Sequence, residues 1–443
     1  MMKKTLVYIS LAMSLMACQK SEQQSQDKSQ LSKEIKENPD YDFVEKKGLK
    51  VLSTGFNAGD GYGEVWVRDF NTFITHSLKV IDQQEVRRNL LTFFRIQGDD
   101  GNIADGFVIV PKGKPYDSLY YHKKAGVEGI VFHKNTVETD QESSLIQSVY
   151  KYIQATGDRS ILTEQIEGQT LLERMESAVN FLLTSRFSEQ YGLLTGATTS
   201  DWGDVQPEHD WGVEIDENTH FSIDIYDNAM FLIALQNLSE METAAPKIAQ
   251  WQKLHRQIAK ATMAQLWDEK AQKFIPHLYL DGSPFPEDFN ENEIYYHGGT
   301  AVAIEAGLLT KEQVLAAYHK MQENVKASGA PSIGLTMYPT YPEGYFKNKG
   351  MYPYGYQNGG DWTWFGARMV IQLVKYGYVN EAVEALEPMV KRVKENNGFY
   401  EWYSVDNKPS GSGTFRGSAG VLMTAIDALR LWGGDETQHF LTK

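Results

Sequence analysis

The stretch Gln357-Asn358-Gly359-Gly360-Asp361-Trp362 places polar and aromatic residues directly before a run rich in small and apolar residues. Five other segments have the same character, and the six recur at intervals of roughly 55 to 85 residues, which is room for a helix pair with its loops. The other five segments are Glu64–Phe70, Glu138–Ser143, Asp224–Ala229, Tyr296–Ala301 and Phe415–Ala419.

Helical periodicity dominates the rest of the chain, because apolar residues recur at three- and four-residue spacing. Six helix pairs that close on themselves form an all-α (α/α)6 toroid, with the leading loops of its inner helices at one end. We expect ligands to bind at that end. The helical pattern is clear over Ser144–Tyr150, Leu171–Leu183, Ala229–Leu238, Ile248–Leu266, Val314–Val325, Ala382–Val393 and Ala419–Leu431.

Three pieces of sequence carry a resemblance to a known family. They are Trp66-Val67-Arg68-Asp69, the stretch Tyr356–Trp362, and Glu401-x-Tyr403 followed by Phe415 and Ser418-Ala419. From about residue 55 onward the chain resembles the six-hairpin glycosidases, and among them the inverting trehalase- and glucosidase-like families. The last piece resembles the segment that bears the general base in the processing α-glucosidase family.

Two acidic segments combine carboxyl groups with aromatic and glycine residues, namely Thr198–Asp204 and Gly398–Tyr403. An inverting glycosidase needs one carboxylic acid to protonate the leaving oxygen and one carboxylate to activate a water on the opposite face of the sugar. The resemblance makes Glu401 the candidate base. The alternative is a loop glutamate that caps the nearby chain.

Asp201 is the candidate acid, since Asp201-Trp202-Gly203-Asp204 resembles the acid-bearing loop of several six-hairpin enzymes, including inverting disaccharide phosphorylases. The reverse assignment, with Asp204 as the acid and Asp201 as a sugar ligand, stays open. So does a purely structural turn, because Asp and Gly favour turns.

The resemblance also implies sugar-binding residues. Arg68 and Asp69 would grip hydroxyls of the terminal sugar, the alternative being a structural ion pair at a helix start. The acidic cluster Glu138, Asp140 and Glu142 would complement a helix dipole. The remaining candidates are stacking platforms, which are alternatively core residues, and hydroxyl ligands: Trp66, Trp202, Trp362, Trp364, Gln357, Asn358, Asp361 and Tyr403.

No cofactor or metal ion is expected. The ten histidines are scattered without the spacing of a zinc-protease motif, and the acidic stretch 281–293 lacks the pattern of an EF-hand loop. The net charge of −15 disfavours a nucleic acid partner and is compatible with a neutral glycan.

The N-terminus predicts export and a lipid anchor. Residues 1–17 combine lysines with an apolar run, as in a signal peptide, and Cys18 follows as in a bacterial lipobox. Residues 18–38 are polar and predict a flexible tether. Residues 39–443 contain no linker-like stretch, so we expect a single catalytic domain. Gln19 after the cysteine favours an outer-membrane lipoprotein, in the periplasm or exposed on the surface.

These features together favour an inverting, exo-acting glycoside hydrolase that removes sugars from α-linked gluco- or mannosides. One alternative is a disaccharide phosphorylase on the same fold, which needs a basic phosphate site near the acid, where the sequence offers His209 and His220. The other is a surface glycan-binding lipoprotein without catalysis, which would have no need for both Asp201 and Glu401.

Overall fold

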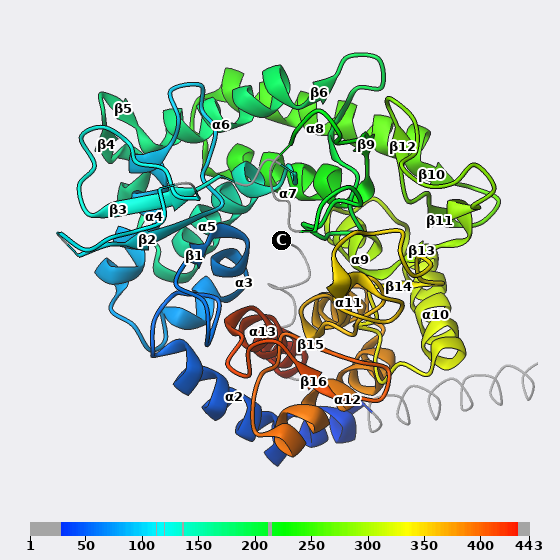
Figure 1. Ribbon diagram of the computed structural model, residues 1–443. Coiled ribbons are helices and arrows are strands. Elements are labelled where there is room, and N and C mark those ends of the chain that lie inside the picture. Colours follow the sequence, from blue (N-terminus) through cyan, green and yellow to red (C-terminus); the bar gives the residue numbers. More distant parts are fainter. Residues whose placement is uncertain (1–27, 112, 119, 135–136, 211–214, 433–443) are drawn as a thin grey trace, which may run out of the picture.

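Two concentric layers of helices form the described part of the chain, residues 28–432 without 112, 119, 135–136 and 211–214, in this computed structural model (Figure 1). Among these residues, six inner helices each contact the next, and the last contacts the first. The ring is closed, so the expected (α/α)6 toroid is confirmed. The inner helices are α3 (Val67–Ser77), α5 (Gln141–Thr156), α7 (Ile225–Met241), α9 (His297–Glu305), α11 (Thr363–Lys375) and α13 (Arg416–Trp432).

The outer layer packs around this ring, and each outer helix contacts at least one inner helix. Two of its helices begin with a capping box, in which the Thr170 or Thr310 hydroxyl accepts a hydrogen bond from a first-turn amide. The outer helices are α2 (Pro39–Leu52), α4 (Gln83–Ile96), α6 (Leu171–Ser185), α8 (Ala245–Leu266), α10 (Lys311–Ser328) and α12 (Val379–Asn396).

The inner helices are more deeply buried than the outer helices. In α9 every residue from His297 to Ile304 is buried, whereas α8 buries only Trp251, Ile258, Thr262 and Leu266. Inner helices pack against neighbours in both layers, so small residues are needed where two helices approach closely. A Cβ on Gly420 of α13 would lie 2.5 Å from the Phe73 Cβ of α3. The closing contact of the ring therefore depends on this glycine.

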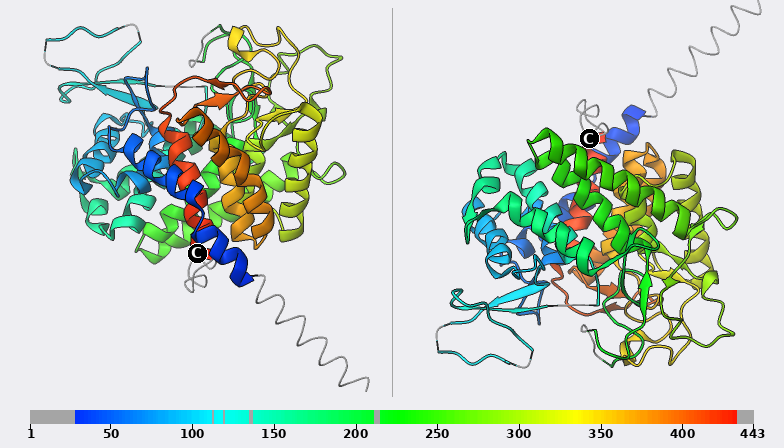
Figure 2. Two further views of the ribbon diagram at one scale, coloured as in Figure 1. Left: turned by 90° about the horizontal axis from the view of Figure 1, so that it is seen from below. Right: turned by 90° about the horizontal axis from the view of Figure 1, so that it is seen from above.

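Most of the short strands and loops gather at one end of the toroid (Figure 2). Each of the six segments singled out in the sequence lies at the start of an inner helix, as expected. The strands are β1 (Val65–Trp66), β2 (Gly106–Ile109), β3 (Ile130–His133), β4 (Gln165–Ile166), β5 (Gln169–Thr170), β6 (Phe187–Ser188), β7 (Leu193–Leu194), β8 (Gly196–Ala197), β9 (Phe221–Ile223), β10 (Trp267–Asp268), β11 (Lys273–Phe274), β12 (Leu278–Tyr279), β13 (Tyr295–Tyr296), β14 (Met337–Tyr338), β15 (Trp402–Tyr403) and β16 (Pro409–Ser410). The 3₁₀ turns are η1 (Arg159–Thr163), η2 (Glu291–Glu293) and η3 (Lys349–Met351).

Small antiparallel sheets organise this end. Strands β1, β2 and β3 form one sheet in that order, β8, β9 and β12 form another, and β15 pairs with β16 in a hairpin. Each of these strands has four residues or fewer. They fix the loops that lead into the inner helices.

The boundary of the expected tether is corrected by the structure. Residues 28–36 are helical, and Ile35 is buried in the same core that extends to Leu429. Leu31 packs against this core four residues earlier, on the same helix face. The expected signal peptide and Cys18 lie outside the described residues. Within the described residues, no helix combines the length and apolar character that a bilayer span requires.

Candidate active site

A cavity of about 740 Å³ opens among the leading loops of the inner helices. Four of the six segments line it, while those before α7 and α9 do not. Nine of the predicted site residues line the cavity: Trp66, Arg68, Asp69, Trp202, Asp204, Gln357, Trp362, Trp364 and Glu401. Four others lie outside its lining: Asp201, Asn358, Asp361 and Tyr403.

Glu401 lies just before the β15–β16 hairpin, and its carboxylate reaches the cavity. The Tyr62 hydroxyl hydrogen bonds to both carboxylate oxygens at 3.0 Å, and the Ser412 amide donates to Oε2 at 3.3 Å. Gly411, at φ +69°, directly follows β16, and a Cβ there would lie 2.3 Å from Oε2. Burial raises the pKa of Glu401, the two donors oppose this, and the charge of Asp204 adds to it.

Asp204 is positioned by Gln357 across the cavity wall. The Gln357 amide donates from Nε2 to Asp204 Oδ1 at 2.7 Å, and its Oε1 accepts from the Asp204 backbone amide at 3.2 Å. Gly203 permits this approach, because a Cβ there would lie 2.6 Å from Gln357 Oε1. The glutamine therefore fixes both the backbone and the carboxyl group of Asp204.

Asp201 faces away from the cavity and caps an inner helix. Its two carboxyl oxygens accept hydrogen bonds from the backbone amides of Gly298 and Gly299, at 2.8 and 2.7 Å, in the first turn of α9. The residue adopts φ +58°, so the chain reverses direction between Asp201 and Asp204. A carboxyl group held in this way satisfies helix amides. The expectation that Asp201 is the acid thus has no support in the geometry, which instead presents Asp204 to the cavity.

The other three residues outside the lining serve the fold. Asn358 donates to the backbone oxygens of Tyr341 and Met351. Asp361 pairs with Arg392 at 2.8 Å and accepts from the Ser332 amide at 2.7 Å, and both charged side chains are 1% exposed.

Tyr403 lies over Arg392, whose guanidinium carbon is 4.1 Å from the centre of the tyrosine ring. Asp361 and Tyr403 also exchange two backbone hydrogen bonds. These residues couple the β15 segment to the start of α11, which supports the loop that carries Glu401.

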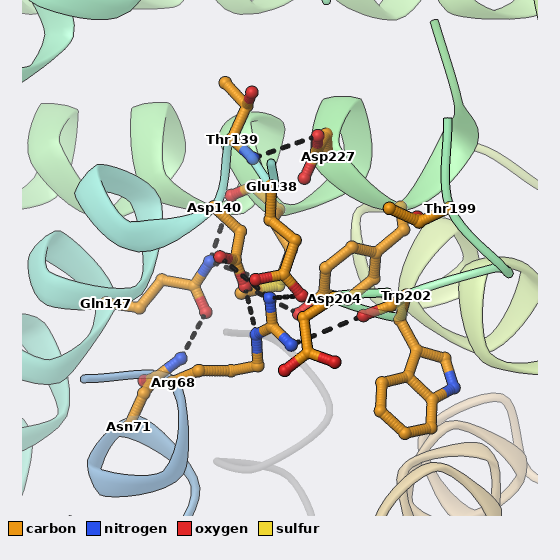
Figure 3. A network of polar contacts seen from close by, with 12 residues as sticks. Arg68, Asn71, Glu138, Thr139, Asp140, Gln147, Thr199, Trp202, Asp204 and Asp227 are labelled. Carbon is orange, nitrogen blue, oxygen red and sulfur yellow. Dashed lines mark hydrogen bonds and ion pairs between the residues drawn. The ribbon is translucent and has the colours of Figure 1, made fainter. Parts of the chain in front are cut away.

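Arg68 is the centre of a charged network at the starts of α3 and α5 (Figure 3). Its guanidinium donates to both oxygens of Asp140, at 2.7 and 3.2 Å, pairs with Glu138, and donates to the Trp202 backbone oxygen at 3.3 Å. Figure 3 shows Asp204 beside this cluster. Glu138 and Asp140 therefore do more than complement a helix dipole, since both line the cavity.

Asp69 differs from its neighbour Arg68. The residue is 7% exposed, and its Oδ1 has no hydrogen-bond partner among the described residues. Burial raises its pKa to about 7, Arg68 opposes this, and Glu401 and Asp204 add to it. A buried acceptor that faces a cavity without a partner is what a ligand hydroxyl would satisfy.

Tryptophan rings form another part of the wall. The Trp202 ring meets Trp362 edge to face, with centroids 4.7 Å apart, and stacks on Phe365 at 4.4 Å. Trp364 also lines the cavity. Trp202 and Trp362 are 1% and 2% exposed, so they are core residues whose edges reach the cavity. The structure therefore supports the core alternative for Trp202 and Trp362, and stacking on a sugar stays a prediction.

Several lining residues have no counterpart in the sequence predictions. Tyr62 lies in the glycine-rich run 59–63, a composition that could have marked a close approach of the backbone. Asp105, Tyr120 and His133 come from the β2–β3 region, which no sequence pattern linked to the inner helices. Of the two histidines proposed for phosphate, His209 lines the cavity and His220 does not.

The described residues offer no ready-made metal centre. Within the described ranges, no group of three or more histidine, cysteine or acidic residues is arranged to hold a metal ion. The lining instead offers carboxyl groups, amides and aromatic rings, which suit proton transfer and hydroxyl recognition.

A closed toroid of six helix pairs with a cavity at one end is the fold of the six-hairpin glycosidases. The family model described as "Glycosyl hydrolase 94 superfamily, catalytic domain" matches residues 50–404, and the chain belongs to this superfamily. The protein is therefore an enzyme of the glycoside hydrolase type. The finer resemblance to trehalase- and processing α-glucosidase-like families stays a prediction.

Solved structures share the fold. A GH63 mannosylglycerate hydrolase from Thermus thermophilus in complex with glucose has 14% sequence identity and a TM-score of 0.61, covering 86% of this chain and 99% of that chain. A rhamnosidase from Klebsiella oxytoca with rhamnose bound has 13% identity and a TM-score of 0.58, covering 88% of this chain and 64% of that chain. No curated protein matches the sequence.

The capping role of Asp201 predicts a stability effect. In Asp201→Asn an NH₂ group faces one of the two α9 amides, so one buried hydrogen bond is lost. We expect the free energy of unfolding to fall by about 1 to 3 kcal/mol, measured by denaturant titration. The exposed Asp288→Asn is the control and should match the wild type. An unchanged stability of Asp201→Asn would contradict the capping role.

The raised pKa of Asp69 predicts a pH-dependent stability cost. The folded pKa is about 7 and the ordinary value is 3.8, so the stability that Asp69 contributes is present below pH 4 and is lost as pH rises through 7. Asparagine is neutral throughout. Asp69→Asn should therefore raise the melting temperature relative to the wild type more at pH 8 than at pH 5. An equal difference at both pH values would contradict this assignment.

Proposed function

We propose that the protein is an inverting, exo-acting glycoside hydrolase of α-linked gluco- or mannosides, with Asp204 as the general acid and Glu401 as the general base. The observation that carries this proposal is that both carboxyl groups line one cavity, near enough for the charge of Asp204 to raise the pKa of Glu401. We expect their oxygens to lie about 6.5 to 9.5 Å apart, leaving room for a water.

Each carboxyl group has a defined task in this mechanism. Glu401 takes a proton from a water molecule while the oxygen of that water forms a bond to the anomeric carbon. The glycosidic C–O bond breaks, and Asp204 gives a proton to the leaving oxygen. Tyr62 and the Ser412 amide hold the Glu401 carboxylate in place. Burial raises the pKa of Glu401, so its carboxylate is a stronger base than a fully solvated one.

The terminal sugar would bind at the buried end of the cavity. Asp69 offers an oxygen without a partner there, and Trp202 and Trp362 close the wall. Arg68 does not grip hydroxyls with a free guanidinium. Its contacts to Glu138 and Asp140 make it a positioning residue that holds two further acceptors at the cavity.

Hydrolysis is favoured over phosphorolysis by the charges of the lining. Among the described lining residues, each positive or potentially positive group faces a carboxyl group: Arg68 faces Asp140, His133 faces Asp105, and His209 faces Asp216. A phosphate ion would enter a predominantly acidic cavity, which opposes its binding. The acidic lining residues are Asp69, Asp105, Glu138, Asp140, Asp204, Asp216 and Glu401.

The choice of α-linked gluco- or mannosides rests on the sequence resemblance. Structures that share the fold support a hexose in such a site, since one is described in complex with glucose and another with rhamnose bound. A panel of α- and β-linked glycosides, followed by identification of the released sugar, tests this part of the proposal.

Substitution of either carboxyl group should abolish most turnover. We expect Glu401→Gln and Asp204→Asn to lower kcat by a factor on the order of 10² to 10⁴ while substrate binding is largely retained. Asp204→Asn should lose least with activated leaving groups, which need no proton. The first product, followed by NMR, should have the β configuration.

The exposed Glu343→Gln is the matched control and should behave as the wild type. Normal turnover of Glu401→Gln, or a first product in the α configuration, would contradict the mechanism. Assays with and without inorganic phosphate separate the two enzyme classes. If sugar is released only when phosphate is present, and as a sugar 1-phosphate, the protein is a phosphorylase and the proposed hydrolysis is wrong.

We also propose that the protein is an outer-membrane lipoprotein anchored through Cys18, in the periplasm or on the cell surface. The support is the lipobox-like sequence alone. Cys18→Ala should shift the protein from the membrane fraction to the soluble fraction, or block its maturation, as judged by fractionation and immunoblotting. An unchanged membrane fraction would refute the anchor.

A further inference from the structure

A row of side chains crosses the β1–β2–β3 sheet at the rim of the cavity. Trp66 pairs with Gly106, and Gly106 pairs with His133, so the three residues are directly opposite one another. A Cβ on Gly106 would lie 2.5 Å from the Trp66 ring. The missing side chain lets the Trp66 and His133 rings meet edge to face above it, with centroids 6.1 Å apart.

Tyr120 extends this row. It comes from the segment between β2 and β3, and its ring stacks on His133 with centroids 4.1 Å apart and an interplanar angle of 21°. The His133 Nδ1 hydrogen bonds to Asp105 at 3.0 Å, which fixes the orientation of the imidazole. Trp66, Asp105, Tyr120 and His133 all line the cavity. They form a continuous aromatic wall with a carboxyl group at its base.

Tyr120 is more exposed than the groups proposed to act on the terminal sugar. Asp69 is 7% exposed and Glu401 is 5% exposed, whereas Tyr120 is 37% exposed. Figure 2 shows the sheet with β2 and β3, in cyan, extending beyond the helical ring. The buried end holds the groups proposed to bind the terminal sugar and to transfer protons. His133 is 1% exposed, so only the Tyr120 end of the wall lies on the outer side, where the rest of a substrate must lie.

We propose that Trp66, His133 and Tyr120 form the binding subsite for the leaving group, and that Tyr120 stacks on a pyranose ring there. This inference rests on the proposed exo-hydrolase function and adds the class of leaving group: a second sugar rather than a small or anionic group. Flat aromatic faces pack against the C–H face of a sugar. Asp105 and the rest of the acidic lining disfavour a leaving group that carries a carboxylate or phosphate.

The test compares a substrate with a sugar leaving group and one without. Wild-type protein and Tyr120→Ala are assayed on α-glucosyl fluoride and α-mannosyl fluoride, and on α-linked disaccharides of the same sugars. The ratio of kcat/KM for the disaccharide to kcat/KM for the fluoride should fall by about tenfold in Tyr120→Ala, mainly through KM. Tyr120→Phe should restore the wild-type ratio, because it keeps the flat ring.

Ile109→Ala is the matched control, since Ile109 belongs to β2, is 71% exposed and does not line the cavity. It should leave the ratio unchanged. Active wild-type protein with the same ratio in Tyr120→Ala would overturn the subsite and leave the proposed hydrolase standing. Wild-type protein that releases sugar from neither fluoride nor any disaccharide would overturn the proposed function, and the subsite with it.

Discussion

Closure of the inner helical ring is the constraint on which the rest of the structure depends. Once α13 packs against α3, the inner helices are enclosed, and their first turns lie buried at one end. The free amides of those turns then need acceptors. Asp201 supplies both oxygens to the α9 amides, and Asp224 caps α7. Asp201 and Asp224 are therefore acidic for a structural reason, before any chemistry is considered.

The same constraint explains how the cavity is supplied with reactive groups. The loops that lead into the inner helices converge at one end of the ring. Polar side chains on neighbouring loops can therefore point into the same cavity. The turn from Asp201 to Asp204 does both tasks within four residues: one carboxyl group stabilises a helix and the other reaches the cavity. Gln357 similarly begins the α11 segment and holds Asp204.

The fold could be predicted from the sequence because its signal is repeated. Helical periodicity and six similar segments before helices together indicate a toroid, even though each segment alone is a weak signal. The site could be predicted only in part, since residue type does not tell which way a side chain points. Asp201 and Asp204 have the same chemistry, and the positive φ of Asp201 separates their directions. Asp361 has the polar character of a sugar ligand, yet its partner Arg392 is 31 residues away in sequence. The wall of Tyr120 and His133 depends on strand pairing that short strands do not reveal.

The two ends of the described chain meet on the side away from the cavity. Lys28 lies over the ring of Trp432, 5.4 Å from its centre, at the far end of α13, and Figure 2 shows the cavity-forming loops at the opposite end. The lipid proposed at Cys18 would hold the toroid by the end opposite the cavity. The mouth of the cavity would then point away from the bilayer, so that long glycans could reach it without passing along the membrane surface.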